Sequence, residues 1–387
     1  MDLASLMPAY PPLPLPLPVW LLQTLLVVGF FLHALPMNVI FGGGFLTAAL
    51  FYAGRNSQTS YAYRAARIFA IALPVFISFA ITQGIVPLLF VQLLYGPAFY
   101  TSSILMAAPW LSIIAVVLVS YYISYTVIYR ILKHDGEKTG SAGKAALLLL
   151  VMSVGFAIVG FLFTNNLTLM LTPEKWAAMY QHSSNGLNLN TSEGQLTPRY
   201  LHTFLASTAV AGLMLGHFGL YFLKREAEFG KWLIKLGSRI FLGSTLWQIP
   251  VGIWYLKAIP GQYASQFMGG DTFATAVFGL SMVLALLSIV TGALTTASGS
   301  GKMHLVTTVV TTLTILAMIV NRHQLRLFYL NPVLKPESQA VAWQTDLFII
   351  FLVSAVALIF YLIWLCKLVW RGYHPAAAAG GTAGTQS

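Results

Sequence analysis

Charged side chains are scarce in this sequence. Only 8% of its 387 residues are Asp, Glu, Lys or Arg, whereas 58% are hydrophobic. A soluble domain carries about 25% charged residues, so these proportions exclude a soluble globular fold. The mean hydropathy of +0.78 and the long apolar runs instead predict an all-α, polytopic membrane helix bundle. A transmembrane barrel would show short alternating segments.

Acidic side chains are missing from the apolar runs. All ten acids fall in expected loops, tails or run ends: Asp2, Asp135, Glu137, Glu174, Glu193, Glu226, Glu228, Asp271, Glu337 and Asp346. The predicted bundle therefore has no internal carboxylate to deliver a proton or to couple ion transport.

Cysteine is almost absent as well. The single residue, Cys366, excludes an intrachain disulfide and the CxxCH motif that attaches a c-type haem. Any haem bound by this chain is therefore held non-covalently, as a haem b is.

Nine apolar segments are long enough to cross a bilayer. They span residues 19–52, 65–94, 101–132, 145–171, 198–223, 231–258, 272–297, 303–321 and 343–370. Residues 1–18 form a Pro-rich lead, residues 19–373 are expected to form one haem-binding transmembrane bundle, and the tail 374–387 is expected to be disordered.

Basic residues gather in alternate loops between these segments. With the N-terminus outside, most of the 21 Lys and Arg residues fall in inner loops. The positive-inside rule therefore predicts an outer N-terminus, an inner C-terminus and a multi-pass protein of a bacterial-type inner membrane. The same placement explains the net charge of +11 without nucleic-acid binding.

Two histidines lie inside the segment 198–223. His202 and His217 are about 22 Å apart along a helix and about 60° apart around it. Imidazole is costly to bury in a bilayer without a partner. A pair on one side of one helix suits two stacked haems, with His33 as a further candidate ligand. The alternative is that each histidine makes a hydrogen-bonded contact between helices.

One predicted outer segment, residues 321–326, breaks the charge rule because it contains Arg322, His323 and Arg326. Arginine forks match carboxylates. This segment, together with Arg199 one turn before His202, is therefore a candidate for binding haem propionates. The alternative is an interfacial helix end with solvated arginines.

The run LHTFLAS, residues 201–207, resembles the fifth helix of subunit I of the cytochrome bd quinol oxidases. That helix carries an HTxxAS-type motif whose histidine ligates the low-spin haem b. The run FLHALP, residues 31–36, is similar to the family's first helix, where a His followed by a Pro ligates a haem. Met282 lies in a segment similar to the helix that supplies the family's second low-spin ligand.

This resemblance implies two or more haems b, quinol as substrate, and a quinol oxidoreductase subunit of a respiratory complex. The sequence departs from the family in three respects. The region 89–92, LFVQ, has no glutamate; the quinol-binding loop is shortened to about residues 259–271; and His217 replaces a small residue.

Depth along the segments predicts how the ligands pair. His33 and His217 are expected to hold one haem from opposite faces. His202 is expected to hold a second haem with Met282 or His323, and His304 is expected to lie at the inner interface.

The sequence therefore predicts a bd-like membrane b-type cytochrome subunit. It would transfer electrons between membrane quinol and a c-type cytochrome or another redox subunit; no catalytic residue is indicated. Three alternatives stay open. They are a terminal quinol:oxygen oxidoreductase of the bd type, a cofactor-free transporter, which the lack of intramembrane charge disfavours, and a structural anchor.

Overall fold

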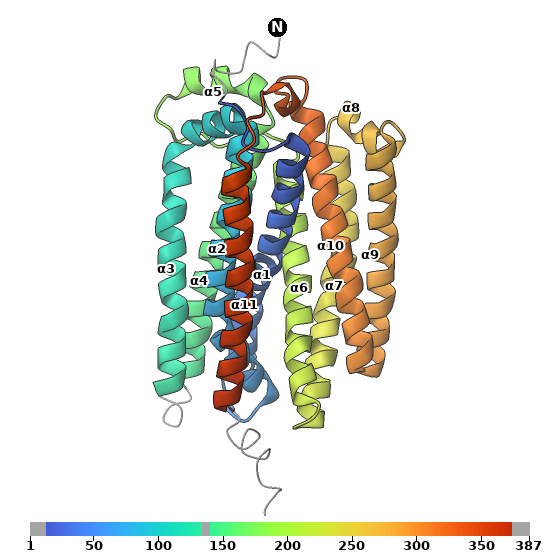
Figure 1. The fold of residues 1–387 in the computed structure, drawn as a ribbon. Helices are drawn as coiled ribbons and strands as arrows, with labels where there is room; N and C mark the ends of the chain where they lie inside the picture. Colours follow the sequence, from blue (N-terminus) through green and yellow to red (C-terminus); the bar gives the residue numbers. More distant parts are fainter. Residues whose placement is uncertain (1–12, 134–139, 374–387) are drawn as a thin grey trace, which may run out of the picture. The chain divides into compact units, whose positions relative to one another are not determined.

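The computed structural model describes residues 13–133 and 140–373 (Figure 1). The start of the Pro-rich lead, the tail 374–387 and the loop acids Asp135 and Glu137 lie outside the described residues. Within these ranges the regular secondary structure is helical, apart from one isolated parallel bridge between Leu15 and Val341.

Nine long helices account for most of the described chain. They are α1 (Val19–Ala53), α2 (Tyr61–Leu105), α3 (Ala107–Lys133), α4 (Gly140–Met170), α6 (Leu196–Phe222), α7 (Ala227–Ala258), α9 (Thr272–Ser298), α10 (Gly301–Leu330) and α11 (Thr345–Tyr373). Short elements connect them: η2 (Pro173–Lys175), α5 (Trp176–His182), α8 (Gly261–Ala264), η3 (Ser265–Met268) and η4 (Pro336–Ser338).

Seven of these described helices are long and apolar enough to cross a membrane, namely all the long ones except α7 and α11. In α7, Lys231, Lys235 and Arg239 lower the hydropathy of the first half. The expected all-α, multi-pass class is therefore confirmed. Which terminus faces outside stays a prediction.

The chain divides into two compact units. The larger contains residues 22–336, and the smaller contains residues 13–21 and 337–373. In the smaller unit, the backbone N–H of Leu15 donates to Ala340 O at 2.8 Å and that of Ala342 donates to Leu15 O at 2.9 Å. These bonds tie the Pro-rich lead to the segment before α11. The functional residues discussed below lie in the larger unit.

Helix α2 differs from the predicted segment because it does not stop after residue 94. It kinks at Tyr95 (φ −130°, ψ 32°) and continues to Leu105. Pro97 lies in the first turn after the kink, where its missing N–H removes no helical hydrogen bond. The expected loop at residues 95–100 was therefore wrong, since the proline bends the helix and does not end it.

Helix α10 is also longer than predicted and reaches Leu330. Its last three turns carry Arg322, His323 and Arg326, of which His323 and Arg326 are only 7% and 6% exposed. Arg326 is therefore not a solvated arginine, and α10 introduces charge into the helix bundle.

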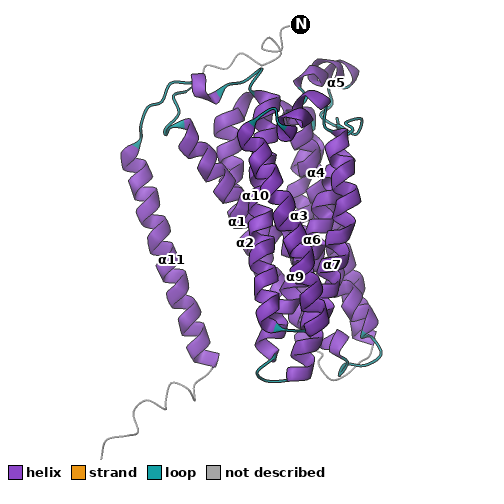
Figure 2. Ribbon diagram, turned by 90° about the vertical axis from the view of Figure 1, so that its right-hand side faces the viewer, coloured by secondary structure: helices purple, strands orange, loops and turns teal. Residues whose placement is uncertain are grey.

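The helices of the larger unit lie side by side (Figure 2). Close approach between α1 and α6 depends on Gly42, because a Cβ there would lie 2.3 Å from Ser207 O. Beside it, Ser207 Oγ donates to Asn38 Oδ1 at 2.7 Å. Backbone contact of this kind requires a small residue.

The two ends of the larger unit differ in composition. One carries α5 and α8 and is called here the α5 end (Figure 1). At the opposite, basic end, Arg64 in the first turn of α2 binds Glu226 before α7, with Nη1 2.7 Å from Oε1, and covers the ring of Phe229 at 4.1 Å. The hydrogen bonds from Arg64 hold the pKa of Glu226 below its ordinary value.

We expect Gly42→Ala to destabilise the bundle by about 1–3 kcal/mol, since backbone must move to admit the methyl group. Gly279→Ala in α9 is the matched control, because no atom lies within 4 Å of its Cβ position. Thermal unfolding in detergent measures both. Equal unfolding temperatures for the two variants would contradict the α1–α6 contact.

Candidate functional site

His33 of α1 faces α2 with a defined orientation. Its Nδ1 lies 2.8 Å from Ala80 O. A carbonyl oxygen only accepts, so the proton sits on Nδ1 and the lone pair on Nε2. A Cβ on Gly84 would lie 2.9 Å from both Cε1 and Nδ1 of the ring. Glycine therefore makes room for an imidazole whose free nitrogen is suited to a metal.

A cavity opens beside His33 and is also lined by Asn166, Arg322, His323 and Arg326. Aromatic and aliphatic side chains of α1 to α4 complete its walls. The space in it that a water-sized molecule can reach is about 80 Å³, and the cavity is open on one side. Two imidazoles and two guanidinium groups thus share one mostly apolar cavity.

The arginines beside this cavity have no acidic partner among the described residues. Arg322 stacks on the ring of Phe30 at 4.0 Å, and Arg326 lies 5.7 Å from the ring of Tyr95. The ion pairs of the described chain involve other bases. Arg199 is 9% exposed, and its Nη1 has no hydrogen-bond partner. Since Arg199 and Arg326 both repel Arg322, the cluster favours an anionic ligand.

Two helix faces meet around these charges. In α6 and the residue before it, Gln195, Arg199 and His202 follow at i, i+4 and i+7, which places them on one face. In α10, Arg322, Arg326 and Tyr329 repeat that spacing. Gln195 Nε2 donates to the Tyr329 hydroxyl at 3.1 Å and joins the two faces.

His202 lies against α7. A Cβ on Gly252 would be 3.4 Å from its Cε1, and the ring of Tyr255 is 6.4 Å away between centroids. Its Nδ1 is buried without a hydrogen-bond partner. The Nδ1 of His323 is buried and unpartnered in the same way. A buried imidazole nitrogen without a hydrogen-bond partner is suited to bind a ligand.

Met282 is less well placed than these histidines to act as a metal ligand. Its side chain is 38% exposed, whereas its neighbour Ser281 is fully buried and accepts a hydrogen bond from Asn321 at 2.8 Å. The helix thus turns Ser281 towards α10 and Met282 away from it. Ligation by Met282 stays a prediction of the family resemblance.

His217 contacts His304. The Nε2 of His304 lies 3.2 Å from the Nδ1 of His217, and that Nδ1 also lies 2.8 Å from Leu213 O. A Cβ on Gly216 would be 2.3 Å from the His304 ring, which is fully buried. His304 is therefore enclosed between helices, and its depth relative to the membrane interface stays a prediction.

His33 and His217 were expected to lie together on one haem, but the structure separates them. His33 shares a cavity with His323, and His217 contacts His304. These two α10 residues are about 28 Å apart at 1.5 Å per residue, so His33 lies towards the α5 end of the bundle and His217 towards the basic end. Within the described residues, no group of three or more His, Cys, Asp or Glu side chains could hold a metal ion.

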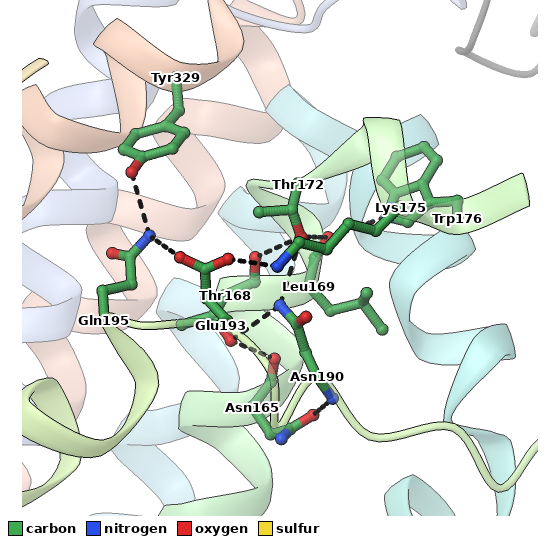
Figure 3. A network of polar contacts seen from close by, with 10 residues as sticks. All are labelled: Asn165, Thr168, Leu169, Thr172, Lys175, Trp176, Asn190, Glu193, Gln195 and Tyr329. Carbon is green, nitrogen blue, oxygen red and sulfur yellow. Dashed lines mark hydrogen bonds and ion pairs between the residues drawn. The ribbon is translucent and has the colours of Figure 1, made fainter. Parts of the chain in front are cut away.

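A polar network closes the α5 end (Figure 3). Lys175 Nζ lies 2.6 Å from Glu193 Oε2, and Gln195 Nε2 donates to Glu193 Oε1 at 3.2 Å. Below them, the backbone N–H of Asn190 donates to Asn165 Oδ1 at 3.0 Å. Sequence reasoning missed Gln195, although its spacing from Arg199 and His202 was a usable signal.

A comparison with solved structures shows which known fold this helix arrangement resembles. The structure of bd oxidase from Geobacillus thermodenitrificans is similar with a TM-score of 0.71 and 11% sequence identity, covering 92% of this chain and 98% of that one. The chain has a bd-oxidase-like fold. No protein-family model and no curated protein sequence matches it. At a sequence identity this low, the structural likeness shows the fold alone. The function therefore has to be argued from the residues of this chain.

We expect a double-mutant cycle of His217→Ala and His304→Ala to give a coupling free energy of about 1 kcal/mol, because the two imidazoles are in hydrogen-bonding contact. His202→Ala combined with His217→Ala is the control and should be additive. Thermal and chemical unfolding in detergent measure the free energies. Additivity in the first pair would show that the imidazole contact contributes nothing.

Proposed function

We propose that this chain is a bd-like membrane b-type cytochrome subunit that transfers electrons between membrane quinol and a redox partner. The observation that carries the proposal is the shared cavity of His33, His323, Arg322 and Arg326. A haem needs an imidazole for its iron and cations for its propionates. This cavity offers both, and its arginines have no described acidic partner.

The side chains divide into two groups in this proposal. His33 and His323 bind iron at the cavity, where Arg322 and Arg326 hold carboxylates. His202 binds a second iron, and Arg199, one turn earlier, faces its carboxylates. A bound haem supplies a one-electron redox centre. The protein orients the ligands, and its apolar walls exclude water.

Two predicted ligands are less well supported. Ligation by His217 requires its contact with His304 to open, and ligation by Met282 requires α9 to turn. We therefore propose His33, His202 and His323 as the ligands that hold haem in the folded protein.

The α5 end faces outwards in this proposal, and the basic end faces the cytoplasm of a bacterial-type cell. The positive-inside rule supports this orientation. The three proposed ligands lie towards the α5 end, so electrons leave through that face. A c-type cytochrome or another redox subunit bound there receives them.

We expect the purified protein to contain haem b that acid-acetone extracts, since no CxxCH motif attaches it. His33→Ala, His202→Ala and His323→Ala should each remove part of the reduced-minus-oxidised spectrum, whereas His182→Ala on the exposed α5 should leave it intact. Pyridine haemochrome counts the haem. A folded, colourless protein that binds anions at the arginines would instead support a transporter.

The alternative function is terminal quinol:oxygen oxidation, and the likeness to a bd oxidase favours it. Against it, no described spanning segment carries an internal carboxylate to bring protons to oxygen. A pair of imidazoles on one iron would also leave no position for oxygen.

We therefore expect the reduced spectrum to be unchanged by carbon monoxide, and quinol to reduce an added high-potential acceptor. Absorption difference spectra and an oxygen electrode test this expectation. Carbon monoxide binding to a large fraction of the haem, with quinol-driven oxygen uptake, would establish the oxidase alternative.

A further inference from the structure

A basic stripe runs along the first half of α7. Lys231, Lys235 and Arg239 follow one another at i, i+4 and i+8, so they are neighbours on one side of the helix. The ammonium of Lys231 lies 3.4 Å from Glu228 Oε1, in an exposed pair within the same helix. The other ion pairs among the described residues leave out Lys235 and Arg239. Two positive charges of the stripe are therefore available to an anion from outside the chain.

Contacts with α9 show how deep these charges lie. The whole of α9 is uncharged, and it is long and apolar enough to span a membrane. A Cβ on Gly299, in the turn after α9, would lie 2.9 Å from Lys235 Cε. A Cβ on Gly292 would lie 2.7 Å from Phe241 Cε1. Since α7 and α9 thus run antiparallel, Arg239 lies between these two levels, within the last turns of the apolar span.

The two charges differ in exposure. Lys235 is half-buried, with its alkyl stem against the α9–α10 turn, whereas Arg239 is exposed. An arginine on the outer side of a spanning segment is costly unless its guanidinium reaches the interface or pairs with an anion. Lipid phosphates lie at that interface, and a guanidinium binds a phosphate through two parallel hydrogen bonds.

The helix surface beyond Arg239 suits an acyl chain. Gly243 and Trp247 continue the stripe in steps of four residues. No atom lies within 4 Å of the Cβ position of Gly243, so there is open space above it. The side chains of Leu246 and Trp247 are 46% and 67% exposed. Positive charge near the basic end thus leads into an open, uncharged surface, in the same order as the head group and tail of a phospholipid.

We propose that this side of α7 binds an anionic phospholipid, with its phosphate between Lys235 and Arg239 and one acyl chain over Gly243 towards Trp247. A lipid of net negative charge, such as phosphatidylglycerol, is favoured over a zwitterionic one, because the cation of the latter would face two positive charges. The bound lipid would let α7 lie in the bilayer despite the charges that lower its hydropathy. The site does not depend on haem.

The test is native mass spectrometry of the full chain in detergent, titrated with phosphatidylglycerol or with phosphatidylcholine. The wild type should bind phosphatidylglycerol at least about five-fold more tightly. Arg239→Gln and Lys235→Met should each raise the apparent Kd for phosphatidylglycerol about three- to ten-fold and leave that for phosphatidylcholine unchanged. Lys302→Met removes an exposed charge from the first turn of α10 at the same end. This matched control should bind both lipids as the wild type does.

The unfolding temperature separates a folding defect from a lost site. Without lipid, the wild type and the three variants should unfold at similar temperatures. Phosphatidylglycerol should then raise the unfolding temperature of the wild type and of Lys302→Met more than that of the two site variants. Equal wild-type affinity for the two lipids, or unchanged phosphatidylglycerol binding in both site variants, would overturn the proposal. Displacement of the lipid by millimolar inorganic phosphate would assign the charges to a free anion instead.

A second membrane protein is the other occupant that the experiment must exclude. Gly243→Cys, in a Cys366→Ser background, places the only thiol of the chain in the open stretch of the stripe. In native membranes, a short cross-linker that joins this thiol to a nearby photoreactive group should yield lipid adducts and no larger protein species. A cross-link to another protein would show that a partner subunit covers the stripe, and lipid binding there would be refuted.

Discussion

Buried positive charge without a described acidic partner is the constraint around which the α5 half of the bundle is arranged. Arg199 and Arg326 are almost fully enclosed, and Arg322 is half-buried. Aromatic rings hold two of them in place: Phe30 lies under Arg322 and Tyr95 near Arg326. Rings attract a cation but do not neutralise it. An anion bound in the cavity would stabilise these helices as well as be held by them.

Glycine provides the second constraint, because each intramembrane imidazole needs room against a neighbouring helix. Gly84 admits His33, and Gly216 admits His304 at closer range. In each case the missing Cβ lets the ring lie directly on backbone. The two glycine contacts have different results. At His33 a ring nitrogen stays free beside a cavity, whereas at His304 a second imidazole fills the space.

Sequence reasoning found the helices better than their ends and their neighbours. Hydropathy located all nine long helices. It ended α10 too early, just before its first charged residue, because a sequence does not reveal that side chains of α1 and α2 will enclose Arg326. It ended one segment at residue 94 and began the next at 101, although α2 continues through this stretch and the first turn after a kink tolerates proline. Spacing gave depth along one helix, as for His217, but not the register between helices, so its contact with His304 was unforeseen.

Under the proposed function, the absence of carboxylates from the interior of the described spanning helices gives the arginines their significance for redox chemistry. An electron that enters a site surrounded by guanidinium groups is attracted to them, and the low dielectric strengthens that attraction. A centre near Arg199 and Arg322 is therefore easier to reduce than the same centre in neutral surroundings. The same field repels protons, so proton transfer is favoured outside the charged interior. Glu193 lies at the margin of the arginine cluster and is already paired with Lys175, so it does not neutralise the charge of that cluster.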